Sequence, residues 1–284
     1  MSLAVGASSA AAPAIGTVLS RGSFRVDHAT VTGNATLFEG SLLETSTAAS
    51  VQLQSGARVS LGQDSRGRLF GDRLVLEKGS SRLDNSTGLR LVALGLTILP
   101  DRSGSQASVS FDNARRVRVS SAAGALRVLN ASGQLIANMP AGAALAFEPQ
   151  QGPATVARIT GCVEQKSGHY VVTDEVTNVT VEVTGSTIDK ELGNKVEVTG
   201  STDPAATPSN DATQLMRARE VRHLANGCGG GTAAAAATGK AAGGGFGVTG
   251  TTVAVIGGVA AAAAIGGLAA SDALPGQSST ASSR

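Results

Sequence analysis

Residues 36–79 read TLFEGSLLETSTAASVQLQSGARVSLGQDSRGRLFGDRLVLEKG, a series of short apolar segments separated by turn residues. Within these segments Val51 and Leu53 alternate with glutamines, and Val59 and Leu61 flank a serine. Such alternation, with a period of two, is typical of strands that bury one face. Ser-Gly, Gly-Gln-Asp and Gly-Asp sequences lie between the segments, and these residues tolerate the backbone angles of tight reversals. The stretch therefore predicts an all-β fold.

The same stretch resembles the FecR-type domain, an all-β envelope module named for a regulator of ferric dicitrate uptake. The resemblance rests on a glycine before a strand that carries a threonine, at Gly40 and Thr45, and on a Ser-Gly turn. It also rests on the pattern V-x-L-x-x-x-S, which Val59, Leu61 and Ser65 match. The resemblance implies a β-sandwich or roll over residues 15–150, with a binding or signal-receiving role in the cell envelope.

A second unit follows a linker rich in Pro, Gly and Gln, and we expect it over residues 155–226. It resembles a small bacterial OB-fold domain, which implies a five-stranded barrel with a short helix at 187–192 before the fourth strand. The expected strands begin at Gly161, Tyr170, Val179, Gly193 and Met216.

The remainder of the chain has a low-complexity composition. Residues 227–247 are a Gly/Ala-rich linker, and residues 271–284 are a polar tail that we expect to be disordered. Between them, residues 248–270 contain no charge and are long enough for a helix to cross a bilayer, so we predict a C-terminal transmembrane helix. A solvent-exposed Gly/Ala tail is the alternative. Residues 1–14 read as the end of a signal peptide or as a disordered Ala-rich leader.

The two cysteines, Cys162 and Cys228, stand at the two ends of the second unit. In a barrel of this kind both ends can meet, so the pair forms a disulfide if the chain is exported, or else two independent thiols. His169 and His223 lie near them, but the spacings C-x6-H and H-x4-C do not match compact zinc motifs. We therefore predict no metal site.

We also predict no cofactor and no catalytic residue. Gly245–Gly250 matches G-x-G-x-x-G literally, but the βαβ context of a dinucleotide site is missing. Asp174 and Glu175 are adjacent, so on a strand they point to opposite faces and cannot act as an acid/base pair. Three scattered histidines do not suggest a triad.

Charge and composition argue against nucleic-acid binding. The net charge is +2, charged residues make up 15 % of the chain and aromatic residues 2 %. Nucleic-acid binders need basic surfaces, and those that bind single strands also need aromatic side chains for base stacking. The densest basic cluster, ARRVRV at 114–119, fits a strand with Arg116 and Arg118 on a solvated face and valines on the other.

These observations together predict a non-enzymatic, envelope-associated binding or scaffold protein, which receives an extracytoplasmic signal. It would be anchored in a bacterial membrane by the C-terminal helix, with its β domains outside the cytoplasm and an envelope protein or glycan as partner. Two alternatives are a hydrolase of envelope polysaccharide, which needs paired carboxylates, and oligonucleotide or sugar binding by the barrel.

Overall fold

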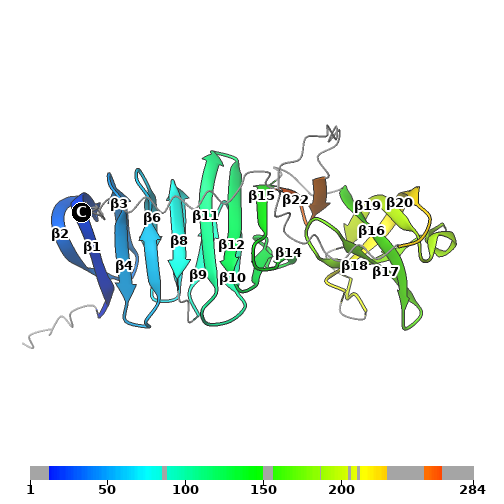
Figure 1. The fold of residues 1–284 in the computed structure, drawn as a ribbon, viewed down its shortest axis with the longest axis horizontal. Helices are drawn as coiled ribbons and strands as arrows, with labels where there is room; N and C mark the ends of the chain where they lie inside the picture. Colours follow the sequence, from blue (N-terminus) through cyan, green and yellow to red (C-terminus); the bar gives the residue numbers. More distant parts are fainter. Residues whose placement is uncertain are drawn as a thin grey trace, which may run out of the picture.

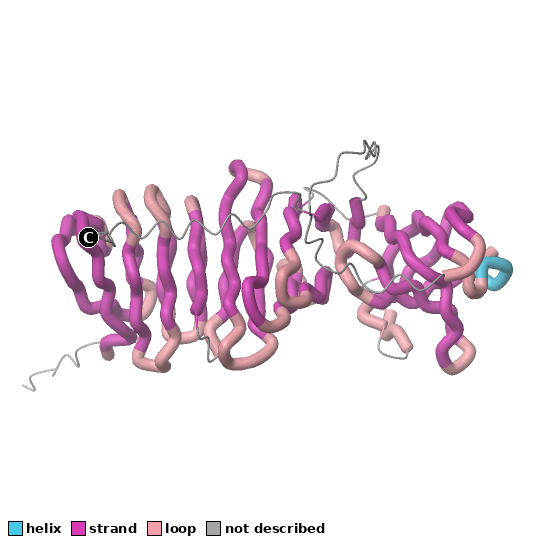
Figure 2. The backbone as a smooth tube through the Cα atoms, viewed as in Figure 1, coloured by secondary structure: helices cyan, strands magenta, loops and turns pink. Residues whose placement is uncertain are grey.

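A computed structural model describes residues 13–84, 88–149, 156–185, 187–203, 206–209, 212–228 and 253–263. Within these ranges the regular structure is β apart from one short 3₁₀ helix, η1 (Ile188–Glu191) (Figure 2). An elongated stack of strands occupies one end of the long axis and a small barrel the other (Figure 1). The prediction of an all-β fold is therefore confirmed.

The elongated unit consists of two sheets that face each other. The first sheet runs, in spatial order, through β2 (Ala29–Phe38), β1 (Ala14–Val26), β4 (Ala49–Leu53), β5 (Arg58–Leu61), β8 (Ser80–Asp84), β11 (Gln106–Asn113), β12 (Arg116–Ala123) and β15 (Ala144–Pro149).

The second sheet also starts from β2 and β1. It continues through β3 (Ser41–Thr45), β6 (Arg66–Leu69), β7 (Arg73–Lys78), β9 (Arg90–Ala93), β10 (Leu96–Pro100), β13 (Leu126–Leu129) and β14 (Leu135–Met139). Only the β7–β9 pair in this sheet is parallel.

The alternation read from the sequence places the core between the two sheets. On β4, residues Ala49, Val51 and Leu53 are buried while the residues between them are exposed. Alternate residues of a strand point to opposite faces, so each strand contributes one apolar row to the interior. Leu83, Leu91 and other inward residues are fully buried. On β12 the valines are likewise buried, while Arg116 and Arg118 pair with acidic residues on the solvated face, as the sequence indicates.

A turn divides one long apolar run. Residues 89–100, LRLVALGLTILP, are almost continuously apolar, but the structure divides them into β9 and β10. Leu94 and Gly95 both have positive φ, 49° and 75°, and form the two-residue turn between the strands. Leucine rarely adopts this conformation, so the residue type gave no turn signal.

At one end of the long axis, β1 bends around the corner between the two sheets. Its first half pairs with β4 in the first sheet, and its last residues, Phe24–Val26, pair with β3 in the second. β2 follows β1 along its whole length on the other side. β2 is therefore the terminal strand of both sheets at this end (Figure 1).

The barrel contains five strands: β16 (Ala157–Lys166), β17 (His169–Asp174), β18 (Thr180–Thr184), β19 (Lys195–Asp203) and β20 (Gln214–Ala225). They close in the order β16-β17-β18-β20-β19-β16, and only β18 and β20 run parallel. The helix expected at 187–192 is η1, between β18 and β19. The prediction of a five-stranded barrel is confirmed.

A hairpin from the C-terminal region closes the other end of the stack. It consists of β21 (Val253–Ile256) and β22 (Val259–Ala263). β22 pairs antiparallel with β15, from Leu145 opposite Ala263 to Pro149 opposite Val259. β21 in turn contacts β16, with Arg158 opposite Val255. The hairpin thus lies between the stack and the barrel (Figure 1).

The barrel covers the last strand of the second sheet at the same end. The Asn138 N–H on β14 donates a hydrogen bond of 2.7 Å to the Thr177 carbonyl of the barrel. Gln214 Nε2 donates one of 3.1 Å to the carbonyl of Leu135. Both terminal strands at this end, β14 and β15, therefore have partners from elsewhere in the chain.

This hairpin overturns the predicted helix over 248–270 for its described part. Residues 253–263 form two strands, because Val253, Val255 and Ile256 favour extended backbone and Gly257-Gly258 supplies a two-residue turn with both φ values positive. In the part of the chain that the structure describes, no helix has the length and apolar character needed to cross a bilayer. The rest of the predicted helix, most of the leader 1–14 and of the linker 227–247, and the tail 271–284 lie outside the described residues.

Candidate binding groove

The residues that carry the FecR resemblance form a buried polar corner. Thr45 Oγ1 donates a hydrogen bond of 2.7 Å to the Gly62 carbonyl and accepts one of 3.1 Å from the Ser65 N–H. Ser65 Oγ in turn accepts one of 2.9 Å from the Ser80 N–H. Thr45 and Ser65 are 5 % and 2 % exposed, so these hydroxyls satisfy buried backbone groups and do not face a ligand.

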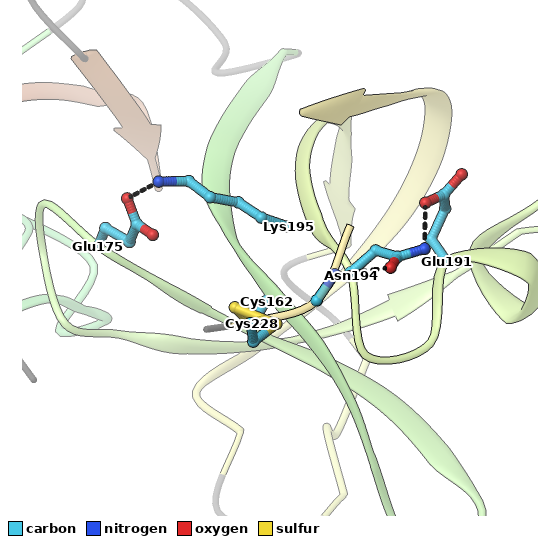
Figure 3. The surroundings of a disulfide bond; sticks show 7 residues. Cys162, Glu175, Glu191, Asn194, Lys195 and Cys228 are labelled. Atoms are coloured by element: carbon cyan, nitrogen blue, oxygen red, sulfur yellow. Dashed lines mark hydrogen bonds and ion pairs between the residues drawn. A yellow bond between two sulfur atoms is a disulfide. The ribbon is translucent and has the colours of Figure 1, made fainter. Parts of the chain in front are cut away.

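Cys162 and Cys228 form a disulfide in the structure (Figure 3). Their Cα atoms are 5.8 Å apart and 66 residues separate them in sequence. The bridge joins the first strand of the barrel to the segment after its last strand. Nearby, Lys195 Nζ pairs with Glu175 at 2.7 Å, which ties β19 to the turn after β17. The disulfide therefore fastens both ends of the barrel to each other.

The two histidines near the cysteines each have their own acidic partner. His169 Nδ1 lies 2.8 Å from Glu182, and His223 Nδ1 lies 2.7 Å from Glu191. Ser209 N–H also donates a hydrogen bond of 2.6 Å to Glu182. Burial raises the pKa of Glu182, but the hydrogen bonds from Ser209 and His169 outweigh it, so the pKa lies below its usual value. The first pair joins β17 to β18, the second joins β20 to η1, and the Ser209 hydrogen bond holds a loop to β18.

Asp174 is a buried carboxylate that organises a turn of the barrel. It accepts hydrogen bonds from the Thr160 N–H at 2.9 Å and from the N–H and hydroxyl of Thr177, both at 2.9 Å. Burial raises the pKa of Asp174 despite these hydrogen bonds. Glu175 points outward to Lys195, so the two adjacent carboxylates diverge, as predicted.

An open groove of about 890 Å³ lies at the bend of β1. It forms because β1 bulges: Leu19 is opposite Asn34 and Ser23 is opposite Thr32, so three residues of β1 face Gly33 alone. A bulge of this kind bends a strand and redirects its side chains.

Hydrogen bonds fix the backbone of this bulge against the start of β4. Ser20 Oγ lies 3.3 Å from Thr47 Oγ1 and donates to the Ala48 carbonyl at 3.2 Å. The Gly22 N–H donates to Ser20 Oγ, also at 3.2 Å. A Cβ on Gly22 would lie 2.5 Å from Thr47 Oγ1, so a larger residue here would displace the Thr47 side chain. The groove is therefore built by a defined local structure.

The lining of the groove combines one cation with several neutral polar groups. Arg21 is its only charged residue, and within the described residues its side chain makes no ion pair or hydrogen bond. Hydroxyl and amide groups come from Ser20, Asn34, Thr47, Ser50 and Ser60. Leu19 adds an apolar surface and is 52 % exposed. This combination suits a ligand that carries both an anionic group and hydroxyl groups.

The sequence interpretation did not identify the groove. Arg21 and Thr47 line the same groove only because of the register of β1 against β2 and β4. The available signal was Gly22 inside a strand pattern, because glycine in a strand often marks a bulge.

Comparison with protein-family models and with curated proteins gives no match.

Proposed function

We propose that this chain is a non-catalytic binding protein of the bacterial cell envelope, outside the cytoplasm, and that its groove binds an acidic oligosaccharide. Arg21 would pair with a carboxylate of the sugar, while Ser20, Asn34 and Thr47 would exchange hydrogen bonds with its hydroxyls. The observation that carries the proposal is the position of Arg21 among neutral polar groups of this groove, where its side chain makes no ion pair or hydrogen bond with the described residues. An open groove also admits one segment of a long polymer.

The location outside the cytoplasm rests on the cysteine chemistry. Disulfides persist in oxidising compartments and are rare in the cytosol, and the barrel holds a Cys162–Cys228 bridge. The proposal that the elongated unit is FecR-like adds the role of receiving an extracytoplasmic signal. In that role, ligand binding at the groove would be the signal.

We further propose that the barrel is OB-like. Its strand order, its parallel β18–β20 pair and its helix between the third and fourth strands support this interpretation. The polar contacts described above pair both of its histidines with carboxylates inside the barrel. We therefore assign the barrel a structural or protein-binding role.

A binding titration tests the proposed function. Nuclear magnetic resonance or calorimetric titration of the full chain with an oligogalacturonate should show binding, and the neutral oligosaccharide of the same length should bind more weakly. Arg21→Ala should weaken binding by about tenfold to a hundredfold, which corresponds to the loss of one hydrogen bond to a charged group.

Arg102→Ala is the matched control, because Arg102 is also exposed and lines a different, smaller pocket of about 440 Å³. This variant should bind like the wild type. Equal binding by the wild type and Arg21→Ala, or no binding of either sugar, would refute the proposal.

A further inference from the structure

The two ends of the elongated unit differ in how their edges are protected. At the barrel end, β15 pairs with β22, and β14 exchanges hydrogen bonds with Thr177 and Gln214. At the other end, β2 pairs only with β1 among the described residues. Among the described residues, the outer edge of β2 therefore has no partner strand for its backbone N–H and carbonyl groups.

β2 also lacks two of the features that protect exposed edges, charged residues and proline. Its sequence, ATVTGNATLF, contains no charged residue and no proline. Charges and prolines on edge strands are the usual means by which proteins prevent pairing with another chain. Two of the exposed large apolar side chains lie on this hairpin, Leu19 at 52 % and Phe38 at 43 %. The β2 edge thus has the properties of a pairing surface.

From these observations we propose that two copies of this chain form a dimer through their β2 strands, which pair antiparallel about a two-fold axis. The two units would then lie end to end. Because each β2 spans the corner between the sheets, the first sheet of one copy would continue into the second sheet of the other. The absence of charge on the β2 edge favours a second copy as the partner. A charged edge would meet the same charge at a self-complementary interface and be repelled.

The shape and charge of the strand select one register. The bend of β2 at Gly33 and Asn34 must meet the bend of the second copy, so the axis passes through one of these two residues. Centring on Gly33 would bring Asp27 and Glu39 of the second copy close together, just beyond the ends of the paired strands, and neighbouring like charges repel each other. Centring on Asn34 avoids this contact, and places Thr32 opposite Thr36 of the second copy.

Charge variants at this pair test the dimer. Thr32 and Thr36 are exposed and make no side-chain hydrogen bond within the described residues, so both accept substitution without loss of the fold. Sedimentation equilibrium of the full-length wild type should give a dimer. Thr32→Lys/Thr36→Lys should give a monomer, because each lysine faces another, and Thr32→Lys/Thr36→Glu should restore the dimer. Circular dichroism verifies that all variants are folded.

Cross-linking tests the register independently. With the axis through position 34, a cysteine at this position lies opposite the same cysteine of the second copy. Their Cα atoms are then at a separation that a disulfide can bridge. Asn34→Cys should therefore form a covalent dimer on oxidation, whereas Thr30→Cys, which faces Phe38, should not. A wild type that stays monomeric at millimolar concentration, or a dimer that both charge variants leave unchanged, overturns the proposal. Sugar binding is tested separately, by titration of Arg21→Ala.

Discussion

Phe147 on β15 and Ala261 on β22 lie directly opposite each other, and both are buried, at 0 % and 3 % exposure. The C-terminal hairpin is thus part of the core of the elongated unit. Ala261→Asp should detach the hairpin from β15, because a carboxylate at this position would be buried without a partner. Hydrogen exchange should show loss of protection in residues 144–149. Ala263→Asp, at the exposed end of β22, should leave that protection unchanged.

The disulfide should contribute measurably to the stability of the barrel. Cys162→Ala should lower the free energy of unfolding by about 2–4 kcal/mol, because the bridge restricts the unfolded chain. Urea unfolding measures the change. Cys228→Ala and the double variant should give the same loss as Cys162→Ala, since each removes the same cross-link. Additive losses would indicate that the two thiols act independently.

Glu182 should make part of the stability dependent on pH. Its folded pKa lies below the unfolded value, so its contribution is present above the unfolded pKa and is lost as the pH falls through the folded pKa. Glu182→Gln removes this titration. The difference in unfolding free energy between wild type and variant should therefore be largest at neutral pH and shrink in acid. A difference that grows as the pH falls would contradict the prediction.

Thr45→Val tests the buried polar corner. The substitution keeps the shape of the side chain but leaves the Ser65 N–H and the Gly62 carbonyl without the hydroxyl. We expect a loss of about 1–3 kcal/mol in unfolding free energy, the cost of an unsatisfied buried polar group. Thr97→Val is the control, because Thr97 is half-buried and makes no side-chain hydrogen bond within the described residues. It should change stability much less.

The sequence predicted those features that depend on local alternation. Val51, Leu53 and Val59 are buried as their spacing indicates, and the barrel strands follow the same logic. The hairpin at 253–263 could not be predicted in this way. Its Ala and Gly residues gave a long uncharged segment that suits a membrane helix, whereas its conformation depends on a distant partner, the edge of β15.

The groove was unpredictable for a related reason. Arg21 has no unusual neighbours in sequence, and its exposure depends on the bulge that sets Ser20–Gly22 against Gly33. Register between strands is a property of the assembled sheet. Gly22, a glycine within a strand pattern, is the one sequence feature that indicates the bulge of β1.

The pairing of β15 with β22 also sets an order of events during folding. Synthesis is vectorial, so a nascent chain that ends before residue 259 exposes the backbone edge of β15 together with apolar side chains around Phe147. The elongated unit becomes complete only when residues 259–263 have joined it. Truncated chains that end before residue 259 therefore retain an unpaired edge on β15. Chaperones and proteases can recognise this edge, which the folded protein does not expose.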